Sequence, residues 1–311
     1  MSEPQIAHYV RVLERGPATR FEWREAVRGL GTLWPRLRHQ PEVAARWRAR
    51  LLRVLDLELM AEDVMIRWDA VRAMERVGGP GAVTAVRLAQ LLDHDEQWLV
   101  GRVIRAIGRT DPDAVRDRLL DFLRELRLSR DAAEALGELR HPDHEVVRAL
   151  VAALGKGTWD GRWAAAAARA SLGRLSAKNQ DIRDLAASEV GPLLGHAREQ
   201  LRMDAVRTLA AIEAPSWQRR CLEALRDPAP HVRWAALAAL IRAGQETEAI
   251  VAAAADPNPG VRAGLADLLI RSRLVIAGQL IEQLCLDPHP DVRIRALDAA
   301  RARFHREVTQ G

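Results

Sequence analysis

A recurring motif of Asp-Pro, Val-Arg and an Ala- and Leu-rich run is the feature that most constrains this fold. The three clearest copies contain Val232, Val261 and Val292, which lie 29 and 31 residues apart. Further copies begin near residues 66, 96, 128, 161 and 201, and a degenerate copy begins near residue 21. A period close to 31 residues is typical of solenoids, in which each repeat forms one supersecondary unit.

Each repeat predicts a pair of helices. The first helix has apolar or small residues at repeat positions 0, 3, 4, 8 and 11, which share one helical face. A Gly or polar turn follows, often with Asp-Pro or His-Pro, and these residues suit the start of a second helix. Because a pair this short cannot bury its apolar face alone, neighbouring pairs must stack. We therefore predict an all-α fold, a right-handed α-solenoid of stacked antiparallel helix pairs.

The predicted organisation is a single solenoid over residues 1–311 with an N-terminal cap at 1–20. Repeat starts are expected near residues 21, 66, 96, 128, 161, 201, 232, 261 and 292, and the last repeat is truncated to one helix. The 40-residue spacing after residue 161 exceeds the others. We expect its extra residues to form an irregular, flexible loop at 171–181.

Asp-Pro-x-x-x-Val-Arg followed by Ala-rich, Leu-ending helices resembles HEAT repeats, especially the short bacterial subclass related to bilin-lyase repeats. The resemblance covers roughly residues 20–303. It implies a HEAT-like superhelix, and the family includes scaffolds, adaptors, bilin lyases and distant DNA glycosylases, so it specifies fold more closely than function.

Arginine supplies 45 of the 47 basic residues, and the repeat register separates many of these arginines into columns. One column follows the repeat Val. A guanidinium there can hold a carboxylate or loop carbonyls of the adjacent repeat, so we predict a structural role. Its members are Arg67, Arg162, Arg202, Arg233, Arg262 and Arg293.

A second column follows the second helices, which line the concave face in HEAT solenoids. It contains Arg87, Arg116, Arg148, Arg183 and Arg220, to which the first repeat adds Arg46, Arg50 and Arg53, and a later second helix adds Trp217 and Arg219. We predict that these residues form a groove for an acidic partner or a phosphate backbone. The alternative is local ion pairing, because acidic residues such as Asp117 and Glu145 lie beside several members of the column.

Four tryptophans share repeat position 2, and a fifth begins a second helix. Trp68, Trp98, Trp163 and Trp234 are expected to pack over the neighbouring repeat. Trp217 has two interpretations: it stacks on a ligand near the groove, or it packs at the start of its helix.

No established catalytic, cofactor or metal motif stands out. His141, His144 and His289 lie in turns and make poor zinc sites. Cys221 and Cys285 fit buried thiols in a reducing compartment better than a disulfide framework. The chain has no apolar run of membrane-spanning length and no signal peptide is visible, so we expect a cytoplasmic protein without cofactors or metals.

The function we predict is a non-enzymatic scaffold or adaptor whose groove holds a protein partner with an acidic surface. The alternative is a DNA-binding HEAT-like protein, such as an alkylpurine DNA glycosylase, with the phosphate backbone in the same groove. Residues 61–160 contain 15 basic and 18 acidic side chains, a balance that is unusual for a strong nucleic-acid binder.

Overall fold

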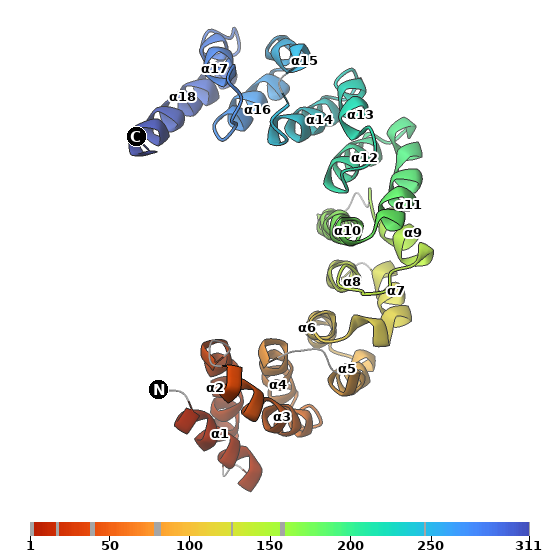
Figure 1. The fold of residues 1–311 in the computed structure, drawn as a ribbon, viewed down its shortest axis with the longest axis vertical. Coiled ribbons are helices and arrows are strands. Elements are labelled where there is room, and N and C mark those ends of the chain that lie inside the picture. The colour runs from red at the N-terminus through yellow and green to blue at the C-terminus, as the bar shows by residue number, and fades with distance from the viewer. Residues whose placement is uncertain are drawn as a thin grey trace. The chain divides into compact units, whose positions relative to one another are not determined.

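The computed structural model is all-helical wherever it describes the chain, at residues 3–16, 19–37, 41–77, 82–125, 127–155, 159–245 and 247–310 (Figure 1). The even-numbered helices are α2 (Arg20–Leu37), α4 (Val64–Val77), α6 (Gln97–Gly108), α8 (Ser129–Leu136), α10 (Trp159–Lys178), α12 (Glu199–Ala211), α14 (Pro230–Arg242), α16 (Pro259–Leu269) and α18 (Pro290–Gln310). The odd-numbered helices are α1 (Glu3–Arg15), α3 (Pro41–Glu58), α5 (Ala82–Ala89), α7 (Arg116–Arg124), α9 (His144–Ala152), α11 (Gln180–Val190), α13 (Trp217–Ala224), α15 (Glu248–Ala252) and α17 (Ala277–Cys285). Short 3-10 helices are η1 (Gln90–Asp93), η2 (Pro112–Val115), η3 (Gly191–Gly195) and η4 (Ala253–Ala255). Within the described ranges, no helix is both long and apolar enough to cross a membrane.

The even-numbered helices are the first helices of the predicted repeats. Each of them begins within two residues of a predicted repeat start. The repeat valines Val232, Val261 and Val292 are all buried, as the one-sided apolar pattern requires. The predicted all-α solenoid fold is therefore confirmed.

The chain divides into two compact units, unit 1 (Met1–Leu175) and unit 2 (Ser176–Gly311), with the boundary inside α10. In unit 1, helices α2, α4, α6 and α8 pack side by side in sequence order, and α10 continues this first-helix layer. The odd-numbered helices α1, α3, α5 and α7 pack against it. In unit 2, α12, α14, α16 and α18 form the first-helix layer, and α11, α13 and α17 pack against it.

The expected irregular loop at 171–181 is wrong. Helix α10 continues to Lys178, and only Asn179 separates it from α11. The Asn179 side chain caps α11 by accepting hydrogen bonds from the backbone N–H groups of Asp181 and Ile182, at 2.9 and 3.3 Å. Leu172 and Leu175 are buried, so the extra residues lengthen an amphipathic helix.

The arginines that follow the repeat valines connect successive repeats in unit 2. Each of three guanidiniums donates two hydrogen bonds, of 2.6–2.9 Å, to an Asp in the turn of the next repeat: Arg202 to Asp227, Arg233 to Asp256 and Arg262 to Asp287. The same guanidiniums also donate to carbonyls of their own turns. The predicted structural role is confirmed for these pairs, whereas the side chain of Arg162 lies outside the described residues.

Candidate functional site

The predicted arginine stripe of α3 faces acidic residues of α1. Arg46 forms an ion pair with Glu3, and Arg50 Nη2 lies 2.5 Å from Glu14 Oε2. The hydrogen bond from Arg50 lowers the pKa of Glu14, and the nearby charge of Arg53 acts in the same direction. This stripe is therefore largely compensated by a neighbouring helix.

The next members of the predicted groove are also paired across second helices. Arg87 Nε lies 3.2 Å from Asp56 Oδ2. Arg116 Nη2 lies 2.6 Å from Asp143 and 2.7 Å from Glu145, and Arg116 also pairs with Asp117. The hydrogen bonds that Arg116 donates to Asp143 and Glu145 raise the pKa of its guanidinium, so its positive charge is retained and compensated by these carboxylates. Arg148 is exposed on α9.

The remaining predicted residues lie in unit 2. The Arg183 guanidinium donates to the backbone carbonyl of Ser176 at 3.2 Å, and Arg219 Nε lies 3.7 Å from Glu223. Arg220 lies against Gly191, because a Cβ added to Gly191 would lie 3.3 Å from Nη1 of Arg220. Trp217 is only 9% exposed, so its ring offers little surface on which a ligand could stack.

Three hollows of the described surface lie on the first-helix layer, and none of the ten predicted groove residues lines them. Arg46, Arg50, Arg87 and Arg116 instead pair with acids of neighbouring helices. The predicted groove along the second helices thus stays a prediction, and the first-helix layer offers a different candidate.

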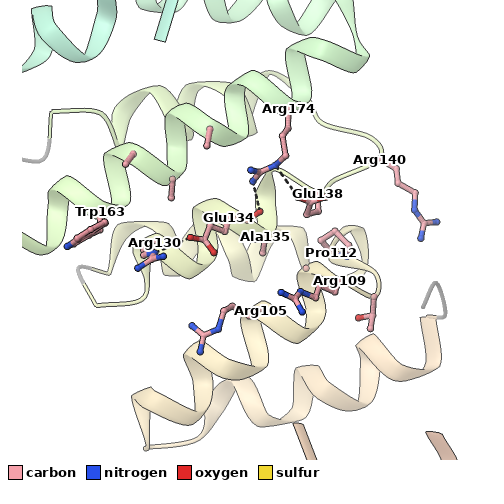
Figure 2. A pocket seen from close by; sticks show the side chains of 15 residues that line it. Arg105, Arg109, Pro112, Arg130, Glu134, Ala135, Glu138, Arg140, Trp163 and Arg174 are labelled. Carbon is pink, nitrogen blue, oxygen red and sulfur yellow. Dashed lines mark hydrogen bonds and ion pairs between the residues drawn. The ribbon is translucent and has the colours of Figure 1, made fainter. Parts of the chain in front are cut away.

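The arginine hollow, of about 730 Å³, lies over α6, α8 and α10 within unit 1 (Figure 2). Its lining residues are Arg105, Gly108, Arg109, Thr110, Pro112, Arg130, Glu134, Ala135, Glu138, Arg140, Trp163, Ala166, Ala167, Ala170 and Arg174. Figure 2 shows Trp163 and Arg140 near opposite ends, with Arg105, Arg109 and Arg130 between them. Residues at helical spacing on three helices therefore contribute to one surface.

Small residues at the helix contacts create this hollow. An added Cβ on Gly108 would lie 3.0 Å from Ala135 of α8, so the two helices already meet at close range. An added Cβ on Gly137 would lie 2.5 Å from Arg174 Nη2 and from Ser171 Oγ. Arg174 uses this space to donate hydrogen bonds to the Glu134 carbonyl, at 3.2 Å, and to Ser171, at 2.9 Å.

Five arginines and two glutamates line the hollow, and most arginines have one carboxylate partner. The ion pairs are Arg105–Asp131 (2.6 Å), Arg109–Glu75 (3.3 Å), Arg130–Glu134 (3.0 Å) and Arg174–Glu138 (3.0 Å). Among the described residues, the Arg140 side chain has no hydrogen-bond or ion-pair partner. The arrangement leaves an excess of positive charge on the hollow's surface.

Two tryptophans of the first-helix layer are unusually exposed. Trp163 is 53% exposed and lies under the Arg130 guanidinium, 5.5 Å from the ring centroid. Trp98 is 42% exposed and helps to line a second hollow of about 640 Å³, which shares Arg105 with the arginine hollow. The two hollows are therefore adjacent.

Each of the four tryptophans contacts a neighbouring repeat, as expected, and Trp163 does so through Arg130 of α8. Trp68 contacts Trp98 edge-on with ring centroids 4.9 Å apart. The Trp234 indole lies directly against Gly264 of the following repeat. Trp98 and Trp163, in contrast, keep much of their surface accessible.

Other reactive groups give no comparable site. Within the described part of the chain, no group of three or more His, Cys, Asp or Glu side chains could hold a metal ion. Both cysteines are free thiols, and burial raises the pKa of Cys221 to about 12. A hollow of about 860 Å³ in unit 2 is lined by Asp267, Asp291 and Asp298 together with Arg295, and it has the opposite charge balance.

Comparisons with known proteins agree with this architecture. Residues 187–270 match the family model of HEAT repeats. The chain thus contains HEAT repeats within unit 2. None of the curated proteins matches its sequence.

Solved HEAT-like structures share the fold at low identity. Kap121p has a TM-score of 0.54 and 13% identity, over 99% of this chain and 39% of Kap121p. Karyopherin Kap121p bound to the extreme C-terminus of the protein phosphatase Cdc14p has a TM-score of 0.56 and 12% identity, over 96% of this chain and 38% of that one. This HEAT-repeat chain thus spans about two fifths of Kap121p.

The CpcE–CpcF complex of phycocyanin lyase from Nostoc sp. PCC7120 is more distant in structure. It has a TM-score of 0.41 and 17% identity, over 81% of this chain and 94% of that chain. Membership in the bilin-lyase-like HEAT subclass therefore stays a prediction.

Proposed function

We propose that this HEAT-repeat chain is a protein-binding scaffold, and that the first-helix layer of unit 1 holds its partner. The observation that carries the proposal is the exposure of Trp98 and Trp163 beside arginine-lined hollows. Trp and Arg dominate the energetically important centres of protein interfaces, because they combine large contact area with directed hydrogen bonds.

The fold is compatible with this role. Repeat solenoids present extended surfaces on which many weak contacts add up. Kap121p, which has this fold, binds a terminal segment of Cdc14p in one solved structure. No single residue of our chain is equated with a Kap121p residue, so the proposal depends on the surface described above.

The test begins with partner capture from the native cell, followed by titration of the identified, purified partner. Replacing Trp98 and Trp163 together by Ala should weaken binding at least about tenfold, since each removes a large anchor. Leu57→Ala is the matched control, because Leu57 is 70% exposed on α3 of the same unit. Equal affinity of the double variant and the control would contradict the proposal.

The nucleic-acid alternative is decided in parallel. Nuclease treatment before capture should leave the partner bound. Titration with duplex DNA should show no binding that falls steeply with salt, the behaviour of phosphate-backbone recognition. Salt-sensitive DNA binding together with loss of the protein partner after nuclease treatment would favour the alternative.

A further inference from the structure

The arginines of the hollow retain unused hydrogen-bond donors. A guanidinium has five N–H donors, and one carboxylate occupies two at most. The carboxylates that pair with Arg105 and Arg109 belong to Asp131 and Glu75, whose side chains are only 15% and 9% exposed. These half-buried acids each hold one part of a guanidinium that lines the hollow, and the other N–H donors of Arg105 and Arg109 stay available.

We infer that the arginine hollow binds an extended acidic segment of the partner polypeptide, with its carboxylates on Arg109, Arg130 and Arg140. This inference rests on the proposed function and specifies the chemistry of its ligand. Arg–carboxylate contacts are charge-assisted and directional, so they select acidic side chains as well as attract them. The intramolecular Arg130–Glu134 pair is exposed and therefore weak, so a ligand carboxylate can compete with it.

The two glutamates of the hollow favour a polypeptide over a nucleic-acid strand. Glu134 and Glu138 each pair with one arginine, and when ionised they keep further lone pairs that can accept hydrogen bonds from a ligand. A peptide backbone supplies one N–H donor at each residue other than proline. A phosphodiester backbone has no such donors, so it would leave the free lone pairs of these glutamates without hydrogen bonds.

The floor of the hollow favours small side chains between the acidic ones. Ala135, Ala166 and Ala170 line the hollow together with the longer arginines, and their short side chains leave room for an extended chain at close range. Trp163 closes one end with a broad apolar face that is 53% exposed. A segment that alternates acidic residues with Ala or Gly matches this sequence of contacts.

The experiment measures fluorescence anisotropy with three fluorescein-labelled probes. The first is Glu-Ala-Asp-Gly repeated three times, the second replaces each acidic residue by Lys, and the third is an oligothymidine of similar length. The full-length chain is compared with R130E/R140E and with R124E. Arg124 is a matched control, since it is 76% exposed on α7 of unit 1 and paired with Asp121 at i−3.

We expect the acidic peptide to bind the wild-type chain and R124E with equal affinity, and to bind R130E/R140E at least about tenfold more weakly. The Lys peptide should not bind the wild-type chain. Trp163→Ala should also weaken binding of the acidic peptide, and circular dichroism should show that each variant keeps its helix content.

Three results would overturn the inference. One is the absence of saturable binding of the acidic peptide up to about 1 mM. Another is equal affinity of R130E/R140E and R124E. The third is tighter binding of oligothymidine than of the acidic peptide at the same arginines. If the natural partner still depends on Trp98 and Trp163 in any of these cases, the scaffold proposal stands and only the ligand chemistry is wrong.

Discussion

At the scale of single residues, burial decides what each arginine does. The side chains of Arg233 and Asp256 are 11% and 9% exposed, and two hydrogen bonds join them. The side chains of Arg295 and Asp267 are 56% and 46% exposed, although their atoms approach equally closely, at 2.6 Å. Proximity is therefore similar in the two pairs, whereas the cost of removing one partner differs because only the first pair is shielded from water.

This contrast gives a direct stability prediction. Arg233→Ala should lower the free energy of unfolding by about 3 kcal/mol, because it leaves the Asp256 carboxylate poorly solvated and unpaired. Arg295→Ala should lower it by less than about 1 kcal/mol. Urea denaturation followed by circular dichroism measures both values, and equal losses in the two variants would count against the structural role of the repeat arginines.

At the scale of elements, the turns of unit 2 should be sensitive to acid. Hydrogen bonds from Arg262 lower the pKa of Asp287, despite the opposing effect of burial. A carboxyl with a lowered folded-state pKa contributes stability above its unfolded-state pKa of about 3.9, and this contribution is lost as the pH falls through the folded value.

Asp287→Asn should therefore be less stable than the wild type at pH 7, and the difference should shrink as the pH falls below about 4. Asp267→Asn, which changes an exposed carboxylate, should show only a small difference at either pH. Thermal unfolding at several pH values provides the measurement. A difference between wild type and Asp287→Asn that stays constant from pH 7 down to pH 3 would refute this assignment.

Helix packing beneath the arginine hollow gives another prediction at this scale. Gly137→Ala places a methyl group about where Arg174 and Ser171 now lie, so α8 and α10 must separate or Arg174 must move. We expect a loss of about 1–3 kcal/mol in unfolding free energy. Gly278→Ala serves as the control, because an added Cβ there meets nothing within 4 Å. Equal unfolding free energies of the two variants would show that the contact between α8 and α10 has room for a methyl group at Gly137.

At the scale of the whole molecule, the repeat register predicts the helices well and the binding surface poorly. The period predicts where each first helix begins, because every repeat must bury the same apolar face. It does not predict the length of α10. Ser, Leu, Gly, Arg and Ala occur in both helices and loops, so tertiary packing decides which of the two this segment forms.

The arginine hollow was missed for a related reason. Its residues lie on or directly after first helices, at spacings that resemble ordinary solvent-facing positions: Arg105 on α6 and Arg109 directly after it, and Trp163, Ala170 and Arg174 on α10. The available signal was the alternation of long and small residues on one helical face. Which arginines are neutralised depends on contacts between repeats, and a single sequence does not contain those distances.

The central claim is that the partner covers the first-helix layer of unit 1, and hydroxyl-radical footprinting tests it most directly. Exposed aromatic side chains react readily, so Trp98 and Trp163 serve as reporters on this layer, and Phe304, 66% exposed on α18 of unit 2, serves as the reference elsewhere. Saturating amounts of the purified partner should reduce oxidation of both tryptophans at least severalfold and leave oxidation of Phe304 unchanged. Unchanged oxidation of Trp98 and Trp163 in the saturated complex would contradict the account.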